Sequence, residues 1–179
     1  MTGPIIARCP CAASHITSPK RATVAVVCYC TDCQAAGRAL AALPENIGVM
    51  QGDGGTPLAL FPKKKLQIHD DRGALRAHKL HPKSPTRRLV CSQCNSMLAL
   101  DFTKGPWLSV PIARCLAPKP MANMRIMTRS RPSGQADLAD DMKNFANFPK
   151  RLVFPLTLNW VAGGFATPKL PAFPPLKMP

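Results

Sequence analysis

The chain has 179 residues, of which 46% are hydrophobic, so it can bury a core and is not disordered as a whole. The N-terminal stretch "MTGPIIARCPC" has no charged segment followed by an apolar run, which argues against a signal peptide. The longest apolar stretch, residues 152–166, contains Pro, Asn and Gly and is too short to span a membrane. We therefore expect a soluble, cytoplasmic protein without a membrane partner.

The net charge of +15 belongs mainly to the middle of the chain, because residues 63–131 carry fifteen Lys and Arg against three Asp. Such a region favours acidic partners, either nucleic acid or a polyanionic small molecule. Glu45 is the only glutamate, which argues against a Glu/Asp pair for acid-base catalysis. The basic residues singled out as candidates to face a partner are Arg38, Lys63, Lys64, Lys65, Arg72, Arg76, Lys79, Arg87 and Arg88.

In chain order, the first predicted elements are a Val-rich strand and a short helix. Residues 22–29 form the strand, and the Ala-rich residues 34–43 form the helix, with Thr31 and Asp32 as caps and Pro44 at its end. Further along, alternating apolar side chains predict a β-sheet. Its strands are expected at residues 73–80, 87–91, 96–102 and 107–115.

A second helix is predicted near the C-terminus. Leu138, Met142 and Phe145 follow one another at helical spacing, which indicates an amphipathic helix over 133–148 that ends at Pro149. The last twelve residues contain five Pro and predict an extended tail without regular structure.

Seven of the eight cysteines fall into three closely spaced groups. In a reducing compartment such cysteines are metal ligands or redox groups more often than disulfides, and a C-x-C disulfide is strained. Thiolates one or two residues apart can reach the same ion, so we predict two metal sites. The pairs complete one closed site with four ligands, while the triplet holds a second ion with one position open. The groups are the pair Cys9 and Cys11, the triplet Cys28, Cys30 and Cys33, and the pair Cys91 and Cys94.

Other arrangements stay open at this point. A single ion with four cysteine ligands would leave the other thiols as packing or reserve groups, and an iron–sulfur cluster is a further alternative because spacing alone does not select the metal. Cys115 is predicted to be a buried or unpaired thiol. Trp107 and Tyr29 are candidates to line a pocket, although Trp107 in a strand is also typical of a core.

The stretches "ARCPCAASHIT", "VCYCTDCQAAG" and "RLVCSQCNSMLALDF" resemble the glutathione-dependent formaldehyde-activating enzyme and centromere protein V family over about residues 5–115. The resemblance implies a mainly β, zinc-binding β-tent (Mss4-like) fold at 1–118. An extension at 119–179 adds the C-terminal helix and the Pro-rich tail. Two Zn²⁺ per chain are implied: a structural zinc bound by Cys9, Cys11, Cys91 and Cys94, and a catalytic zinc held by Cys28, Cys30 and Cys33.

The chain departs from the family pattern at four positions near these cysteines. Tyr29 stands where the family usually has His, and Gln34 where Arg is common. Ala12 and Asn95 replace the Gly that normally follows each structural pair. Asn adopts a left-handed turn at modest cost, whereas Ala does so less readily.

Three thiolates on Zn²⁺ form a soft centre that suits the capture of another sulfur ligand better than the activation of water. By resemblance, the expected activity is that of a carbon–sulfur lyase similar to S-(hydroxymethyl)glutathione synthase. It would act on an adduct of a small thiol, such as glutathione, with formaldehyde or a similar aldehyde. The alternative is a non-catalytic zinc protein that binds nucleic acid or a protein partner through its basic surface.

Overall fold

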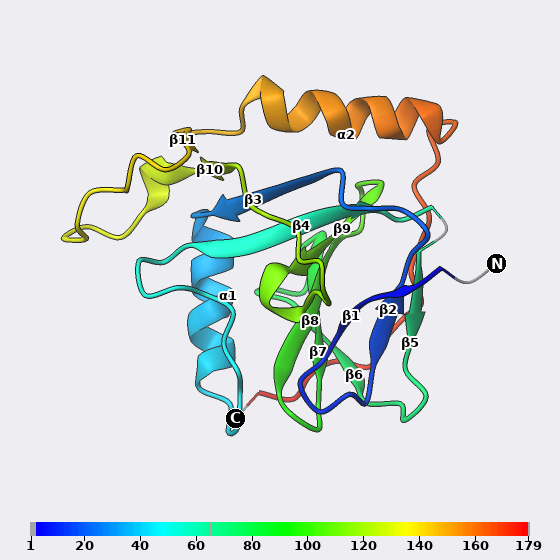
Figure 1. Cartoon of the computed structure of the whole chain (residues 1–179). Coiled ribbons are helices and arrows are strands. Elements are labelled where there is room, and N and C mark those ends of the chain that lie inside the picture. The colour runs from blue at the N-terminus through cyan, green and yellow to red at the C-terminus, as the bar shows by residue number, and fades with distance from the viewer. Residues whose placement is uncertain (1–2, 65, 179) are drawn as a thin grey trace.

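The computed structural model describes residues 3–64 and 66–178 and shows a mainly β protein with two α-helices outside the sheets (Figure 1). The smaller sheet is antiparallel and has the strand order β1 (Ile5–Arg8), β2 (His15–Thr17) and β5 (Gln67–His69). The mainly β prediction is therefore confirmed.

The larger sheet carries the core of the molecule, and its order places strands that are distant in the sequence, at residues 24–28 and 124–126, side by side. Neighbouring strands are antiparallel except where β10 meets β3 and β11. Its eight strands are, in order, β11 (Lys143–Asn144), β10 (Met124–Ile126), β3 (Val24–Cys28), β4 (Thr56–Pro62), β9 (Trp107–Pro111), β8 (Ser96–Phe102), β7 (Thr86–Cys91) and β6 (Leu75–His78).

The sequence-predicted strands match this sheet well. Every residue of β3 is buried, which explains its continuous Val-rich run. The expected strands after residue 73 appear as β6, β7, β8 and β9. A short 3₁₀ helix, η1 (Ile112–Arg114), follows β9, and a second one, η2 (Thr128–Ser130), follows β10.

Helix α1 (Thr31–Ala41) begins three residues earlier than predicted. The residue before it, Cys30, has an extended backbone, and its sulfur accepts the backbone N–H of Cys33 at 3.4 Å. A sulfur therefore caps this helix in place of the predicted Thr31 and Asp32 oxygens, and the triplet is built into the first turn.

The helix predicted over 133–148 is wrong. Within that stretch β11 pairs with β10, and Asp141 forms an ion pair with Arg125 at 2.8 Å. The backbone N–H of Phe145 donates to the carbonyl of Arg125 at 2.9 Å, and the Phe145 side chain packs against a core cluster. These tertiary contacts hold the segment extended and override its helical spacing.

The second helix, α2 (Lys150–Ala162), begins after Pro149 instead of ending before it. Pro suits this place because its missing N–H would be unpaired in a first turn anyway. Leu152 and Leu156, one turn apart, are buried against the large sheet, and Figure 1 shows α2 lying across it beyond β3. Among the described residues, no helix is both long and apolar enough to cross a membrane.

The Pro-rich tail is extended, as predicted, and it packs along the edge strand β6. The N–H of Ala77 donates to the carbonyl of Pro174 at 2.8 Å, and the N–H of Leu176 donates to the carbonyl of Ala77 at 2.9 Å. The guanidinium of Arg87 lies over the ring of Phe173, 5.7 Å from its centroid. The tail therefore covers backbone groups that an edge strand would otherwise expose.

A buried ion cluster joins Lys63, which directly follows β4, to Asp101 in β8 and Arg87 in β7, and it gives a first prediction. Asp101, 1% exposed, lies 2.6 Å from the Nζ of Lys63 and 2.8 Å from the Nε of Arg87. Asp101→Asn leaves two cations without their carboxylate, so we expect the free energy of unfolding to fall by about 3–5 kcal/mol in urea titrations. Asp141→Asn is the control, because the Asp141 side chain is 55% exposed, and it should cost much less stability; equal effects would contradict the prediction.

Candidate metal centres and their cavity

The first cysteine group joins two hairpins that are far apart in the sequence. Cys9 and Cys11 lie in the turn between β1 and β2, Cys91 ends β7, and Cys94 lies in the turn before β8. Their four Sγ atoms lie within 4.8 Å of one another, with 3.5 Å between Cys9 and Cys11 and 3.6 Å between Cys11 and Cys91. All four are free thiols. A tetrahedral zinc with Zn–S bonds of about 2.3 Å places its sulfurs roughly 3.8 Å apart, so this group fits a metal ion.

Two left-handed residues shape the turns that carry these cysteines. Ala12 has a φ of 58° and Asn95 a φ of 49°, the conformation that Gly adopts without cost. In the first turn, the N–H of Ser14 donates to the sulfur of Cys9 at 3.3 Å. In the second, the Asn95 side chain donates to the carbonyl of Pro44 at 3.0 Å. Both residues that replace the family's Gly therefore adopt the left-handed conformation, including Ala12, which does so less readily than Asn.

The second group is local in the sequence. Cys28 is the last residue of β3, Cys30 caps α1 and Cys33 lies in its first turn, so one strand-to-helix junction positions all three. Their Sγ atoms also lie within 4.8 Å of one another. No fourth Cys, His, Asp or Glu from the described ranges 3–64 and 66–178 joins this group. The structure thus brings the seven cysteines together as the four and the three that their spacing predicts.

Electrostatics within the triplet favour a bound cation. The thiols of Cys28 and Cys33 donate to the sulfur of Cys30, and together with the nearby Arg88 guanidinium they lower the pKa of Cys30 to about 3. The bond to Cys30 raises the pKa of Cys28 to about 12, and bonds to both partners raise that of Cys33. A cation bound among the three sulfurs would favour the ionised form of each as a ligand.

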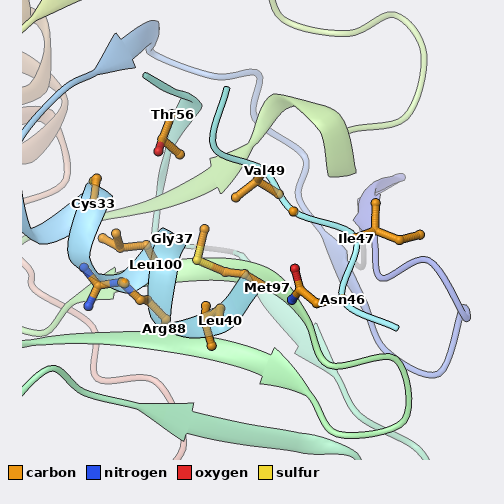
Figure 2. Close-up of a pocket in the computed structure, with 12 residues that line it drawn as sticks. Cys33, Gly37, Leu40, Asn46, Ile47, Val49, Thr56, Arg88, Met97 and Leu100 are labelled. Carbon is orange, nitrogen blue, oxygen red and sulfur yellow. The ribbon is translucent and has the colours of Figure 1, made fainter. Parts of the chain in front are cut away.

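Arg88 is the basic residue that approaches the triplet. It lies in β7, is 1% exposed, and donates from Nη2 to the carbonyl of Asp32 in α1 at 2.8 Å. Its Nη1 is buried and finds no hydrogen-bond partner in the part of the chain that the structure describes. Figure 2 shows Arg88 beside α1 in a small cavity of about 20 Å³, which Cys33 and Thr56 also line.

A larger cavity of about 490 Å³ opens beside the triplet, and all three cysteines line it. Strands of the large sheet form its floor, with Leu58, Leu100 and Trp107 among the lining side chains. Helix α2 forms its roof through Leu152 and Leu156. Its volume lies in the range of pockets that hold small ligands. Sequence reasoning missed this cavity because it placed the second helix before Pro149.

The two aromatic residues and the eighth cysteine that the sequence singled out lie in different surroundings. Trp107 lines the large cavity, whereas Tyr29 is fully buried and donates to Asp53 at 2.6 Å. Cys115 is buried outside both metal groups, as predicted, and its thiol donates to the carbonyl of Pro111 at 3.6 Å.

The basic residues singled out from the sequence take different places in the structure. Lys63 and Arg87 are bound to Asp101, and Arg88 reaches the triplet. Lys65 lies outside the described residues. The remaining candidates, which are exposed or half-buried, are Arg38, Lys64, Arg72, Arg76 and Lys79.

Comparisons with known proteins identify no family. No protein-family model matches this chain, and no curated protein sequence matches it. Among solved structures, the chain is similar to the crystal structure of a Rhodobacter sphaeroides protein that was a Northeast Structural Genomics target. The two share 14% identity with a TM-score of 0.40, and the match covers 81% of this chain and 99% of the other. Membership of the formaldehyde-activating enzyme and centromere protein V family stays a prediction from the cysteine motifs.

The left-handed alanine in the first cysteine turn gives a stability prediction. Ala12→Gly removes the steric cost of a Cβ at a φ of 58°, so we expect the free energy of unfolding to rise by about 1 kcal/mol. The neighbouring Ala13→Gly is the control, because Ala13 has no positive φ and should lose stability from the added freedom of the unfolded chain. Thermal unfolding of both variants at fixed zinc concentration tests this, and stabilisation by both would contradict it.

Proposed function

We propose that this protein is a zinc-dependent carbon–sulfur lyase-like enzyme that acts on thiol–aldehyde adducts. One observation carries the proposal: three mutually close thiols, Cys28, Cys30 and Cys33, line a cavity of about 490 Å³. A three-sulfur set leaves one position of a tetrahedral ion for a further ligand, and the cavity gives that ligand access to the sulfurs.

The two cysteine groups support different roles. In the first group the protein supplies four sulfurs, which is typical of structural zinc, and these come from two hairpins that are distant in the sequence. In the second group the protein supplies three sulfurs beside a cavity, which is typical of catalytic zinc. The resemblance of the cysteine motifs to the formaldehyde-activating family implies the same division.

A zinc ion in the triplet would supply a soft Lewis acid that keeps an incoming thiol in its thiolate form near neutral pH. The thiolate sulfur then adds to the carbonyl carbon of an aldehyde, which forms a carbon–sulfur bond. The electron pair of the broken π bond moves to oxygen, and the alkoxide takes up the proton that the thiol released. Cleavage of the adduct is the same sequence in reverse, and neither direction needs an oxidant or reductant.

Arg88 is suited to assist this addition. Its guanidinium belongs to a residue that lines the cavity, so its positive charge can stabilise the oxygen on which negative charge develops, while its Nη2 stays bound to the carbonyl of Asp32. The apolar walls of the cavity limit water around the reacting atoms, which strengthens this interaction.

A second candidate is a zinc-stabilised scaffold that docks a protein partner. The observation that favours it is the outer face of α2, where Phe154 and Leu158 are 65% and 52% exposed, with Phe165 at 61% just beyond the helix. Such residues are typical of interaction surfaces. A filled triplet site without any thiol-dependent turnover would favour this candidate over the enzyme.

Metal content and turnover of cysteine variants test the enzymatic proposal. We expect wild-type protein to hold two zinc equivalents by elemental analysis. Cys30→Ala should lose one equivalent and lower the rate of thiol–aldehyde adduct formation by at least about a hundredfold, because it removes one of the three sulfurs that the described residues supply at this site. Cys115→Ala, outside both groups, is the matched control and should keep both equivalents. Full turnover in Cys30→Ala would contradict the proposal.

Variants of two neighbouring arginines test the role of Arg88. Arg88→Met should lower kcat per bound zinc by about a hundredfold, with a smaller change in KM, because the lost positive charge acts on the negative charge that develops in the reaction. Arg88→Lys should recover part of kcat. Arg87→Met is the control, because Arg87 binds Asp101 and does not line the cavity. An unchanged kcat in Arg88→Met would exclude the assigned role.

A further inference from the structure

We infer that the cavity beneath α2 binds an apolar substituent of the thiol substrate, so that the substrate class is thiols with an aliphatic or aromatic group and not glutathione. That the thiol sulfur binds at the triplet rests on the proposed function. That the rest of the ligand is apolar rests on the side chains that line the cavity.

The side chains that line the cavity are mainly apolar and come from both of its walls. Leu58 and Leu60 of β4 and Trp107 of β9 lie on the sheet side, and Leu152 and Leu156 lie on the helix side. The two helix residues are only 4% and 7% exposed, so α2 seals this side of the cavity. A ligand that fills such a space gains stability from each apolar group it brings out of water.

Charged groups are confined to the end of the cavity that the triplet occupies. Asp32 and Arg88 are the charged residues among the described side chains that line it, and they are joined through the Asp32 carbonyl. Glutathione carries two carboxylates and an ammonium group in addition to its thiol. One guanidinium can neutralise one carboxylate, so a second carboxylate inside the cavity would lie in apolar surroundings without a partner, which is costly.

The mouth of the cavity is also apolar. Phe148, Val153 and Trp160 line the cavity, yet they are 58%, 49% and 36% exposed. They therefore face the cavity and the solvent at once, along the side of α2. A charged peptide-like thiol finds no cation among these three residues, whereas a thiol with an apolar chain contacts all of them on entry.

A chain-length series of ligands tests the inference by binding, independently of turnover. Zinc-loaded full-length protein is titrated calorimetrically with ethanethiol, butanethiol and hexanethiol, with the alcohols of the same lengths, and with glutathione. We expect the affinity of the thiols to rise about fourfold per methylene, or on the order of 200-fold from ethanethiol to hexanethiol. A rise of less than about tenfold, or tighter binding of glutathione than of hexanethiol, overturns the inference.

The alcohols separate a failure of the inference from a failure of the proposed function. If thiols and alcohols of equal length bind equally, with the same steep dependence on length, the apolar site stands and the sulfur capture fails. If thiols bind more tightly than alcohols but without dependence on length, sulfur capture stands and the apolar site fails.

Two valines of α2 provide a matched pair of variants that should both fold. Val153 lines the cavity mouth at 49% exposure, whereas Val161 is 47% exposed and does not line the cavity. Val153→Asn should weaken hexanethiol binding by about fivefold and leave ethanethiol binding unchanged, because only the longer chain reaches the mouth. Val161→Asn should change neither affinity. Equal effects of the two substitutions on hexanethiol would overturn the placement of the ligand beneath α2.

Discussion

The structure depends on the convergence of four sulfurs from two hairpins that are distant in sequence. Cys11 and Cys91 are eighty residues apart, yet their sulfurs lie 3.6 Å from one another, and the small sheet is thereby tied to the end of β7. As thiolates the four would repel one another strongly at this distance, so a cation bound among them would stabilise the fold. The unfolded chain cannot form this group, so such binding would contribute to the free energy of folding.

The second cysteine group follows from the same sheet but obeys a different constraint. Its three residues lie within one strand-to-helix junction, so an ion there ties no distant segments together. The junction is already held by other means: β3 is buried between β4 and β10, and Gln34 of α1 donates to the carbonyls of Tyr29 and Ser130. The fold therefore does not depend on a fourth protein ligand at this group, and the cavity borders the three sulfurs on one side.

The sequence was most informative where one local pattern sufficed. Alternation in residues 96–102 predicted β8, and the spacing of the cysteines predicted both groups. Sequence reasoning failed where tertiary contacts or an unusual cap decide the structure. Strand β10 holds the region around Phe145 extended despite its helical spacing. Helix α1 begins earlier than predicted because the sulfur of Cys30 caps it. Arg88 could not be distinguished from the other basic residues of the central region, because its role depends on the face of β7 and the place of α2.

Charge balance links Arg88, the triplet and the apolar cavity. Three thiolates with one divalent ion would carry a net charge of −1, which the buried guanidinium of Arg88 would offset. Asp32, the other charged residue that lines the cavity, is exposed to solvent. An incoming thiolate would add one further negative charge beside the guanidinium of Arg88. Further anionic groups on the ligand would exceed what the lining residues neutralise. The selectivity for apolar thiols that we propose would follow from this charge balance around a metal ion in the triplet.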